Sequence, residues 1–242
     1  MTDAEEPTIW MRPEVSGHGK APAHSRDQIA AAAVAIADAE GIEAVSMRRV
    51  AREVDAGTMS LYRYLRNKDE LYALMVDAIL GPDENPRRMR SDWQDMLRDV
   101  GRSIRQLVLQ HPWFPALQAG MPAPSPKMFR GMEGMLAAVD GIGLTIDEML
   151  EIVFTVMTFA MGSAQDELAE ARAIFRSGLD RQQWQRRQGP YLRSLIESGE
   201  YPYLRRMVVD AALPHEDPDT LFERALNRII TGIAATAKPA QD

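Results

Sequence analysis

Apolar positions recur at helical spacing along most of the chain, and no segment shows the sustained alternation of a β-strand. Near the N-terminus the pattern predicts four helices, at residues 25–40, 46–54, 58–66 and 68–80. Further on it predicts six more, at residues 92–110, 127–141, 146–173, 181–198, 201–211 and 219–236. Prolines gather in the later connections. The pattern therefore predicts an all-α fold with a helical bundle in its C-terminal two thirds.

Capping residues mark where the first helices begin. The run 25–28 has the form of a capping box, and Ser46 and Asn67 are good N-caps. Between the second and third helices, Gly57 can adopt a positive φ, as a sharp turn often requires. Thr58 can then cap the third helix. The spacing thus predicts two short helices joined by a tight turn.

The third predicted helix carries polar and aromatic side chains on or near its exposed side, namely Thr58, Met59, Ser60, Tyr62, Arg63 and Tyr64. Six basic and two acidic residues between 46 and 68 give this stretch a net charge of +4, in a chain whose net charge is −7. A basic patch within an acidic protein favours contact with a polyanion. The alternative is a pair of ordinary bundle helices with solvated charges, which leaves the two tyrosines unexplained. We interpret the two helices as a helix-turn-helix DNA reader.

The run GTMSLYRYLRNKDEL at residues 57–71 resembles the TetR family of bacterial transcriptional repressors, and SMRRVA at 46–51 is similar to its second helix. Segments 109–114 and 184–202 resemble the Tet-repressor-type C-terminal domain. The resemblance implies a base contact for Arg48 and base-facing positions for Thr58, Met59 and Tyr62. It implies phosphate-facing positions for Ser60, Tyr64 and Lys68. Thr58 and Met59 differ from the Tet repressor's own side chains, so its operator sequence is not carried over.

We predict three regions: an irregular N-terminal arm at 1–24, a helix-turn-helix domain with a connecting helix at 25–80, and a helical domain for ligand binding and dimerisation at 81–238. Lys20 and His24 could bring the arm to DNA, although a flexible terminus is the simpler interpretation. A reader of this kind binds double-stranded DNA, usually a palindromic operator, so we predict a homodimer. Whether such a protein represses or activates depends on where its operator lies relative to the promoter; we predict a repressor.

The dimer interface is predicted from two helices with wide apolar surfaces. The helix at 219–236 carries Leu221, Phe222, Ala225, Leu226, Ile229, Ile230, Ile233 and Ala234. The helix at 181–198 carries Trp184, Tyr191, Leu192, Leu195 and Ile196. Together they could form a four-helix contact with a second subunit. The alternative is that both helices pack only within one subunit.

Methionine and aromatic residues are frequent in the predicted bundle, and methionine adapts to irregular ligand shapes. The family's design implies a small-molecule effector, which we expect to be bulky and apolar. The candidate ligand residues are His111, Trp113, Met135, Phe154, Met157, Thr158 and Met161. Plain core packing is at least as good an interpretation for each of them from the residues alone. His111 is equally well explained as a histidine at the end of a helix.

The sequence offers little for other classes of function. It contains no cysteine and only four histidines, and the G-x-G-x-x-G, P-loop, H-E-x-x-H and G-x-S-x-G motifs are absent. We therefore predict no catalytic residue, no cofactor and no metal site. No apolar run approaches the ~20 residues that span a bilayer. We expect a soluble, cytoplasmic protein without a membrane partner; an enzyme and a protein-binding adaptor are the rival classes.

Overall fold

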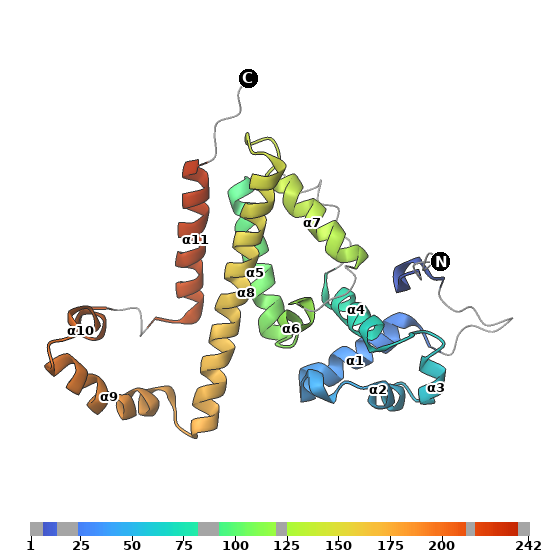
Figure 1. Cartoon of the computed structure of the whole chain (residues 1–242), viewed down its shortest axis with the longest axis horizontal. Helices are drawn as coiled ribbons and strands as arrows, with labels where there is room; N and C mark the ends of the chain where they lie inside the picture. Colours follow the sequence, from blue (N-terminus) through green and yellow to red (C-terminus); the bar gives the residue numbers. More distant parts are fainter. Residues whose placement is uncertain (1–6, 14–23, 82–91, 120–124, 212–215, 237–242) are drawn as a thin grey trace, which may run out of the picture.

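The computed structural model describes residues 7–13, 24–81, 92–119, 125–211 and 216–236, and within them it contains helices and no strand (Figure 1). The all-α prediction is therefore confirmed. The N-terminal elements are η1 (Ile9–Met11), α1 (Arg26–Glu40), η2 (Ile42–Ala44), α2 (Met47–Glu53), α3 (Thr58–Leu61) and α4 (Lys68–Ile79). The later elements are α5 (Trp93–Gln110), α6 (Phe114–Ala119), α7 (Pro126–Ala138), α8 (Ile146–Ser177), α9 (Arg181–Glu197), α10 (Pro202–Val209) and α11 (Pro218–Thr236).

The predicted caps form at three of the four helices. The capping box at Ser25 is complete, the Ser46 side chain accepts from the amide of residue 49, and the Asn67 side chain accepts from that of residue 70. The prediction for the turn is wrong. Asp55 has the positive φ, at 52°, whereas Gly57 has φ −72° and is itself the N-cap of α3. Aspartate tolerates the left-handed region better than most residues, so the turn does not need its glycine there. Thr58 is the first helical residue rather than the cap.

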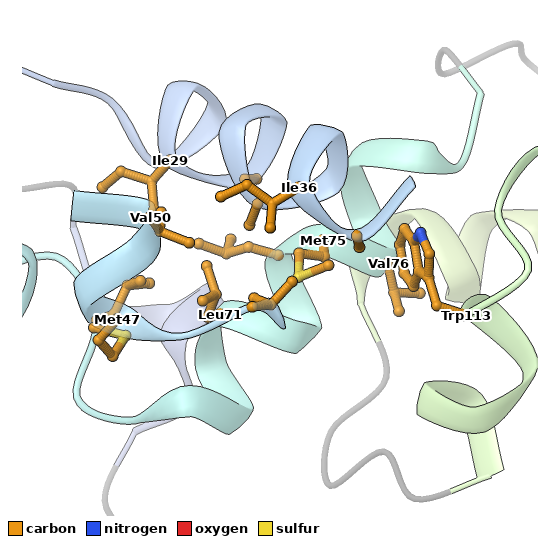
Figure 2. Packing of buried hydrophobic residues seen from close by; sticks show 14 of the residues in the cluster. Ile29, Ile36, Met47, Val50, Leu71, Met75, Val76 and Trp113 are labelled. Atoms are coloured by element: carbon orange, nitrogen blue, oxygen red, sulfur yellow. The ribbon is translucent and has the colours of Figure 1, made fainter. Parts of the chain in front are cut away.

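The elements η1 to α4 form a head, built around a core in which α1 packs across α4 (Figure 2). Ile29, Val50, Leu71 and Met75 are fully buried in this core. The core does not stop at the head. It continues into Val108, Trp113, Phe114 and Ala164, which belong to α5, to the α5–α6 turn and α6, and to α8. The head therefore packs directly on the bundle.

The second core lies between α5, α8 and α11 and contains Leu97, Val139, Met149, Val153, Val156, Met157, Ala160, Phe222, Leu226 and Ile230. The close approach of α5 to α11 depends on Gly101. A Cβ placed there would lie 3.0 Å from both methyl groups of Leu226, which is fully buried. This glycine is needed for packing rather than for an unusual backbone conformation.

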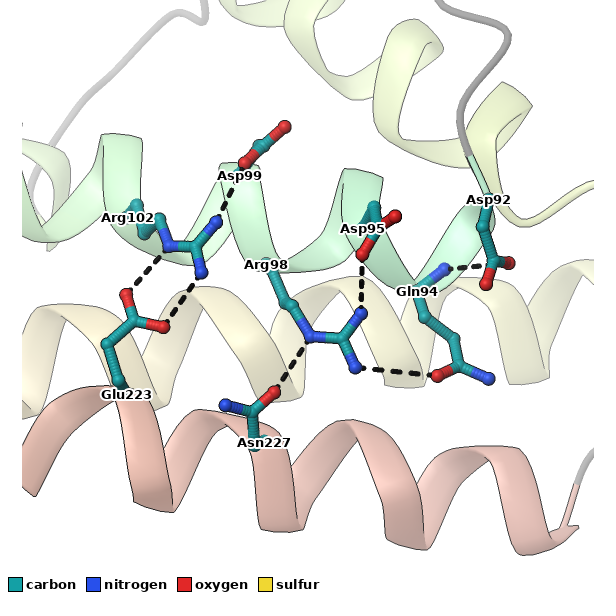
Figure 3. A network of polar contacts seen from close by, with 8 residues as sticks. All are labelled: Asp92, Gln94, Asp95, Arg98, Asp99, Arg102, Glu223 and Asn227. Carbon is teal, nitrogen blue, oxygen red and sulfur yellow. Dashed lines mark hydrogen bonds and ion pairs between the residues drawn. The ribbon is translucent and has the colours of Figure 1, made fainter.

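A row of polar contacts runs along the edge of the α5–α11 contact (Figure 3). The Arg98 Nε donates to Asn227 Oδ1 at 2.8 Å. One turn further on, the Arg102 guanidinium donates to both carboxylate oxygens of Glu223, at 2.7 and 2.8 Å. This paired contact lowers the pKa of Glu223, mainly through the hydrogen bonds from Arg102. The two helices are thus joined by apolar packing and by specific polar pairs.

Helices α9 and α10 extend away from the bundle: α9 contacts the end of α8, and α10 contacts α9 (Figure 1). Their exposed apolar side chains include Tyr191, Tyr201, Tyr203, Met207, Val208 and Val209. In α11, by contrast, Phe222, Leu226 and Ile230 are buried within the same chain. The last helix therefore uses part of its apolar surface inside the subunit. Trp184 has its side chain outside the described residues.

Two further features depart from the expected pattern. Helix α6, Phe114–Ala119, is not among the predicted helices, because prolines at 112 and 115 mark that stretch as a connection. Residues 9–11 of the arm form a 3-10 turn with Ile9 buried, so this part of the arm is not irregular.

Lys20 lies outside the described residues. No described helix is both long and apolar enough to cross a membrane.

Candidate nucleic-acid interface and ligand site

The short helices α2 and α3 are held to the head by their apolar sides. Val50 and Ala51 of α2 and Leu61 of α3 are buried, and so is Leu65 in the turn that follows. Helix α3 comprises only four residues and ends at Leu61, after which the chain turns through residues 62–64. The side chains that remain outside this anchored layer form one surface, which we call the reading face. It consists of Arg48, Thr58, Met59, Ser60, Tyr62, Arg63 and Lys68.

Most of the predicted DNA-contacting residues are accessible on the reading face. Met59 is 79% exposed and Tyr62 is 46% exposed. Arg48 and Arg63 are exposed, while Thr58, Ser60 and Lys68 are half-buried. The ammonium of Lys68 lies 5.0 Å from the centre of the Tyr72 ring, a cation–π contact that orients its side chain. An apolar side chain beside hydroxyls and cations is suited to contact both bases and phosphates.

Tyr64 does not lie on this surface. It is 6% exposed and belongs to the head core, so the expectation that it lies on or near the exposed side of its helix is wrong. The reason is the early end of α3. Once the backbone leaves the helix after Leu61, helical spacing no longer determines where the following side chains point, and the turn directs Tyr64 inward.

The positive charge of the reading face is smaller than the basic residues of the segment suggest. Arg49 donates to Glu53 at 2.6 Å and to Glu40 at 2.9 Å, and these hydrogen bonds raise its pKa above the ordinary value. Its charge is thus used within the head. Arg48 and Arg52 are exposed on the same helix, and neither forms an ion pair with another described residue.

Two of the predicted ligand residues lie at the junction of head and bundle. Trp113 is 4% exposed, and its Nε1 donates to Asp38 Oδ1 of α1 at 2.7 Å. The Nδ1 of His111 lies 2.8 Å from the same oxygen. One carboxylate of the head therefore binds two side chains of the α5–α6 corner. No pattern along the chain indicates this contact, because Asp38 and Trp113 are 75 residues apart.

The other five predicted ligand residues do not gather in one place. Met135 and Met157 pack in the second core, whereas Met161 packs against the head core. Phe154 is 50% exposed and Thr158 is exposed, on the outer side of α8. The hollow between α8 and α11 is lined by other residues, among them Phe159, Ser163, Leu221, Phe222, Ala225 and Arg228. The role of the predicted residues in ligand binding stays a prediction.

Acidic and histidine side chains offer no metal site in the part of the chain that the structure describes, since no three of them are grouped to hold an ion.

Comparison with known proteins gives consistent matches along the chain. Residues 29–75 match the model of the bacterial regulatory proteins of the tetR family. Residues 85–237 match the model of the tetracyclin repressor-like C-terminal domain. The HTH-type transcriptional repressor DrrR1 of Streptomyces coeruleorubidus is 35% identical over 226 residues, covering 93% of this chain and 83% of that protein.

Solved structures show the same arrangement. ActR of Streptomyces coelicolor, described as a TetR family protein, superposes with a TM-score of 0.72 at 28% identity in its complex with (S)-DNPA. This match covers 89% of this chain and 100% of that one. Its complex with actinorhodin gives a TM-score of 0.71 at 28% identity, covering 88% of this chain and 98% of that one. The similarity therefore extends over the head and the bundle together.

Proposed function

The chain belongs to the TetR family of bacterial regulatory proteins, and we propose that it binds a palindromic operator as a homodimer through the reading face. It is a helix-turn-helix transcriptional regulator, and we infer that it acts in the cytoplasm as a repressor rather than as an enzyme. The observation that carries the proposal is the exposure of Met59 and Tyr62 beside the cations of α2 and α4. An aromatic and a thioether side chain left in water at a four-residue helix are best explained by a partner that covers them.

The reading face suggests a division of roles. Arg48 is exposed on α2 and can donate to the O6 and N7 of a guanine. Met59 and Tyr62 can contact base edges and thymine methyl groups, with Thr58 beside them. Ser60, Arg63 and Lys68 can bind phosphates, and Lys68 does so from the first turn of α4, where the helix dipole adds to the attraction. Tyr64 is buried in the head core, so we assign it the role of supporting this surface from beneath rather than of contacting DNA.

We infer that the second copy packs on the α9–α10 segment and on the uncovered side of α11. Tyr191, Tyr203 and Val209 are 64%, 78% and 61% exposed on that segment. Large exposed apolar groups that cluster on adjacent helices mark an interaction surface. A two-fold symmetric partner would cover both segments in the same way. Binding to a palindromic operator further requires that the two-fold axis bring both reading faces to one side of the dimer.

A small-molecule effector would act through the bundle. ActR has been solved with two small molecules, and the resemblance over head and bundle supports a ligand-responsive design here as well. We propose a bulky, apolar effector that binds in the bundle and releases the protein from DNA. The flexible side chains of Met135 and Met157, at the second core, could rearrange around such a molecule.

Selection of binding sites from random duplex DNA, at two salt concentrations, tests the DNA proposal. We expect an enriched inverted repeat and binding that weakens as salt rises. Weak, salt-sensitive binding without an enriched sequence would contradict operator recognition by the free protein and leave a ligand-locked regulator or a protein-binding adaptor. Sedimentation of the free protein tests the dimer, and a monomeric mass at micromolar concentration would refute it. A screen of apolar aromatic compounds for release of the selected operator tests the effector.

A further inference from the structure

The segment before α1 is part of the head. Ile9 is 3% exposed in the head core, and Trp10 packs against that core. The Arg26 Nη1, in the first turn of α1, donates to the carbonyl oxygens of Ile9 and Arg12, each at 3.0 Å. Two backbone carbonyl groups and two apolar side chains therefore fix residues 9–12 in place. Such contacts tie the segment down, whereas the terminal residues of most domains lack them.

Arg12 connects this segment to the region behind the reading face. Its guanidinium forms an ion pair with Glu70 Oε2, and the two side chains are only 18% and 15% exposed. The same oxygen accepts from the backbone amide of Arg66 at 2.7 Å. The amide of Glu70 in turn donates to the Asn67 side chain at 2.9 Å. Glu70 thus joins three parts of the head: the N-terminal segment, the link at residues 66–67, and α4.

The link at 66–67 determines how the reading face is assembled, because it connects the turn after α3 to the first residue of α4. Tyr62 lies on one side of it and Lys68 on the other. The Glu70 carboxylate holds the link by its hydrogen bond to the Arg66 amide. A carboxylate this shielded from water is stabilised by a paired cation, and Arg12 supplies that cation. Without Arg12 the carboxylate gains by turning toward solvent, which would release the amide.

We propose that Arg12 is a positioning residue for operator recognition, which acts through Glu70 to hold Tyr62 and Lys68 in their relative geometry. This rests on the proposed reading of an operator by the same face. Arg12 itself does not contact the DNA, since its charge is used by Glu70. It lowers the cost of ordering the link when the protein binds its operator.

The test compares Arg12→Ala with Met11→Ala, a control in the same segment whose side chain is 76% exposed. Affinity for the selected operator and for random duplex is measured between about 50 and about 200 mM salt, the range over which phosphate contacts show in the slope. All proteins are kept at a temperature where circular dichroism shows them folded. We expect Arg12→Ala to weaken operator binding about tenfold, as for one charge-assisted hydrogen bond. The salt slope should stay unchanged, and Met11→Ala should match the parent.

A second variant tests whether Arg12 acts through Glu70. Glu70→Gln keeps an oxygen that can accept from the Arg66 amide but removes the charge that Arg12 pairs with. Arg12→Ala should therefore have little further effect on operator affinity in the Glu70→Gln background. Arg12→Lys, which keeps a cation, should restore part of the affinity, and it serves as the test variant if Arg12→Ala does not fold.

Two results would overturn the proposal. A salt slope reduced by about one in Arg12→Ala would mean that Arg12 binds a phosphate directly. A lower melting temperature with unchanged operator affinity would mean that the ion pair only stabilises the fold. Selection of no operator by the parent protein would instead refute the proposed function, so the two failures are distinguishable.

Discussion

The contact of Asp38 with the α5–α6 corner predicts that a single carboxylate on the surface of α1 stabilises the whole chain. The Asp38 Oδ1 accepts from the buried Trp113 and contacts His111, so Asp38→Ala removes the partner of both. Of the two, Trp113 matters more. Its ring is 4% exposed, and its Nε1 would be left without an acceptor in a place that water reaches poorly.

The size of the effect follows from these surroundings. An unsatisfied buried donor costs about 1–3 kcal/mol. The His111 contact is more open to solvent, with side-chain exposures of 18% and 32%, and is worth about 0.5–1 kcal/mol. We therefore expect Asp38→Ala to lower the free energy of unfolding by about 1.5–4 kcal/mol, the sum of the two contributions. Trp113→Phe removes the donor together with its need for an acceptor, and it should cost less than Asp38→Ala.

Urea unfolding, followed by circular dichroism, measures these differences at a fixed protein concentration, because any dimer contributes to the apparent stability. Asp140→Ala is the control, since Asp140 is exposed in the turn after α7 and makes no hydrogen bond to another described residue. Surface changes of that kind stay within about 0.5 kcal/mol. A double-mutant cycle between Asp38→Ala and Trp113→Phe should show coupling. Equal losses for Asp38→Ala and Asp140→Ala would refute the reasoning.

Four other substitutions test the reading face and the α5–α11 contact. Lys68→Ala should weaken binding to every duplex and lower the slope of log affinity against log salt concentration by about one. Arg48→Ala should reduce the free energy of operator binding by about 1–3 kcal/mol and relax specificity at one operator position. An equal loss of affinity on all sequences for Arg48→Ala would count against a base contact. The hydrogen bonds from Arg102 lower the pKa of the Glu223 carboxyl in the folded chain. The pair therefore stabilises the fold at pH values above the ordinary pKa of a glutamate, and this stabilisation is lost as the pH falls through the lowered pKa. Urea unfolding of Glu223→Gln and of the parent at several pH values tests this. The difference between their free energies of unfolding should become smaller as the pH falls, and a difference that does not change with pH would contradict the pairing. Gly101→Val should cost about 1–3 kcal/mol in the same melts, because its branched side chain would overlap the methyl groups of Leu226; unchanged stability would show that α11 can move away.

Local signals in the sequence determined where the helices of the head begin. Serine at 25 and 46 and asparagine at 67 cap their helices as predicted, because a cap needs only its own side chain and the amide three residues later. The helix-turn-helix and the family followed from one continuous run of residues for the same reason. Such features depend on neighbours in the chain, so a sequence displays them directly.

The tertiary structure decided the features that join distant residues. The sequence places Tyr64 on or near the exposed side of a predicted helix, yet it is buried, because α3 ends after one turn and the ring then packs into the head core. The sequence predicts His111 and Trp113 as ligand residues, but the fold brings both of them to Asp38. No pattern along the chain shows which of several exposed carboxylates will meet them.

The same distinction applies to the charges. The sequence determined that the stretch around α2 and α3 carries excess positive charge, since that is a sum over neighbouring residues. It did not determine which cations remain available to DNA. Only the fold brings Glu40 to Arg49, and Glu70 to Arg12 across 58 residues of chain. The polar side chains of the head therefore divide into those that hold its shape and those that face outward, and this division depends on distances that exist only once α1, α2 and α4 have packed together.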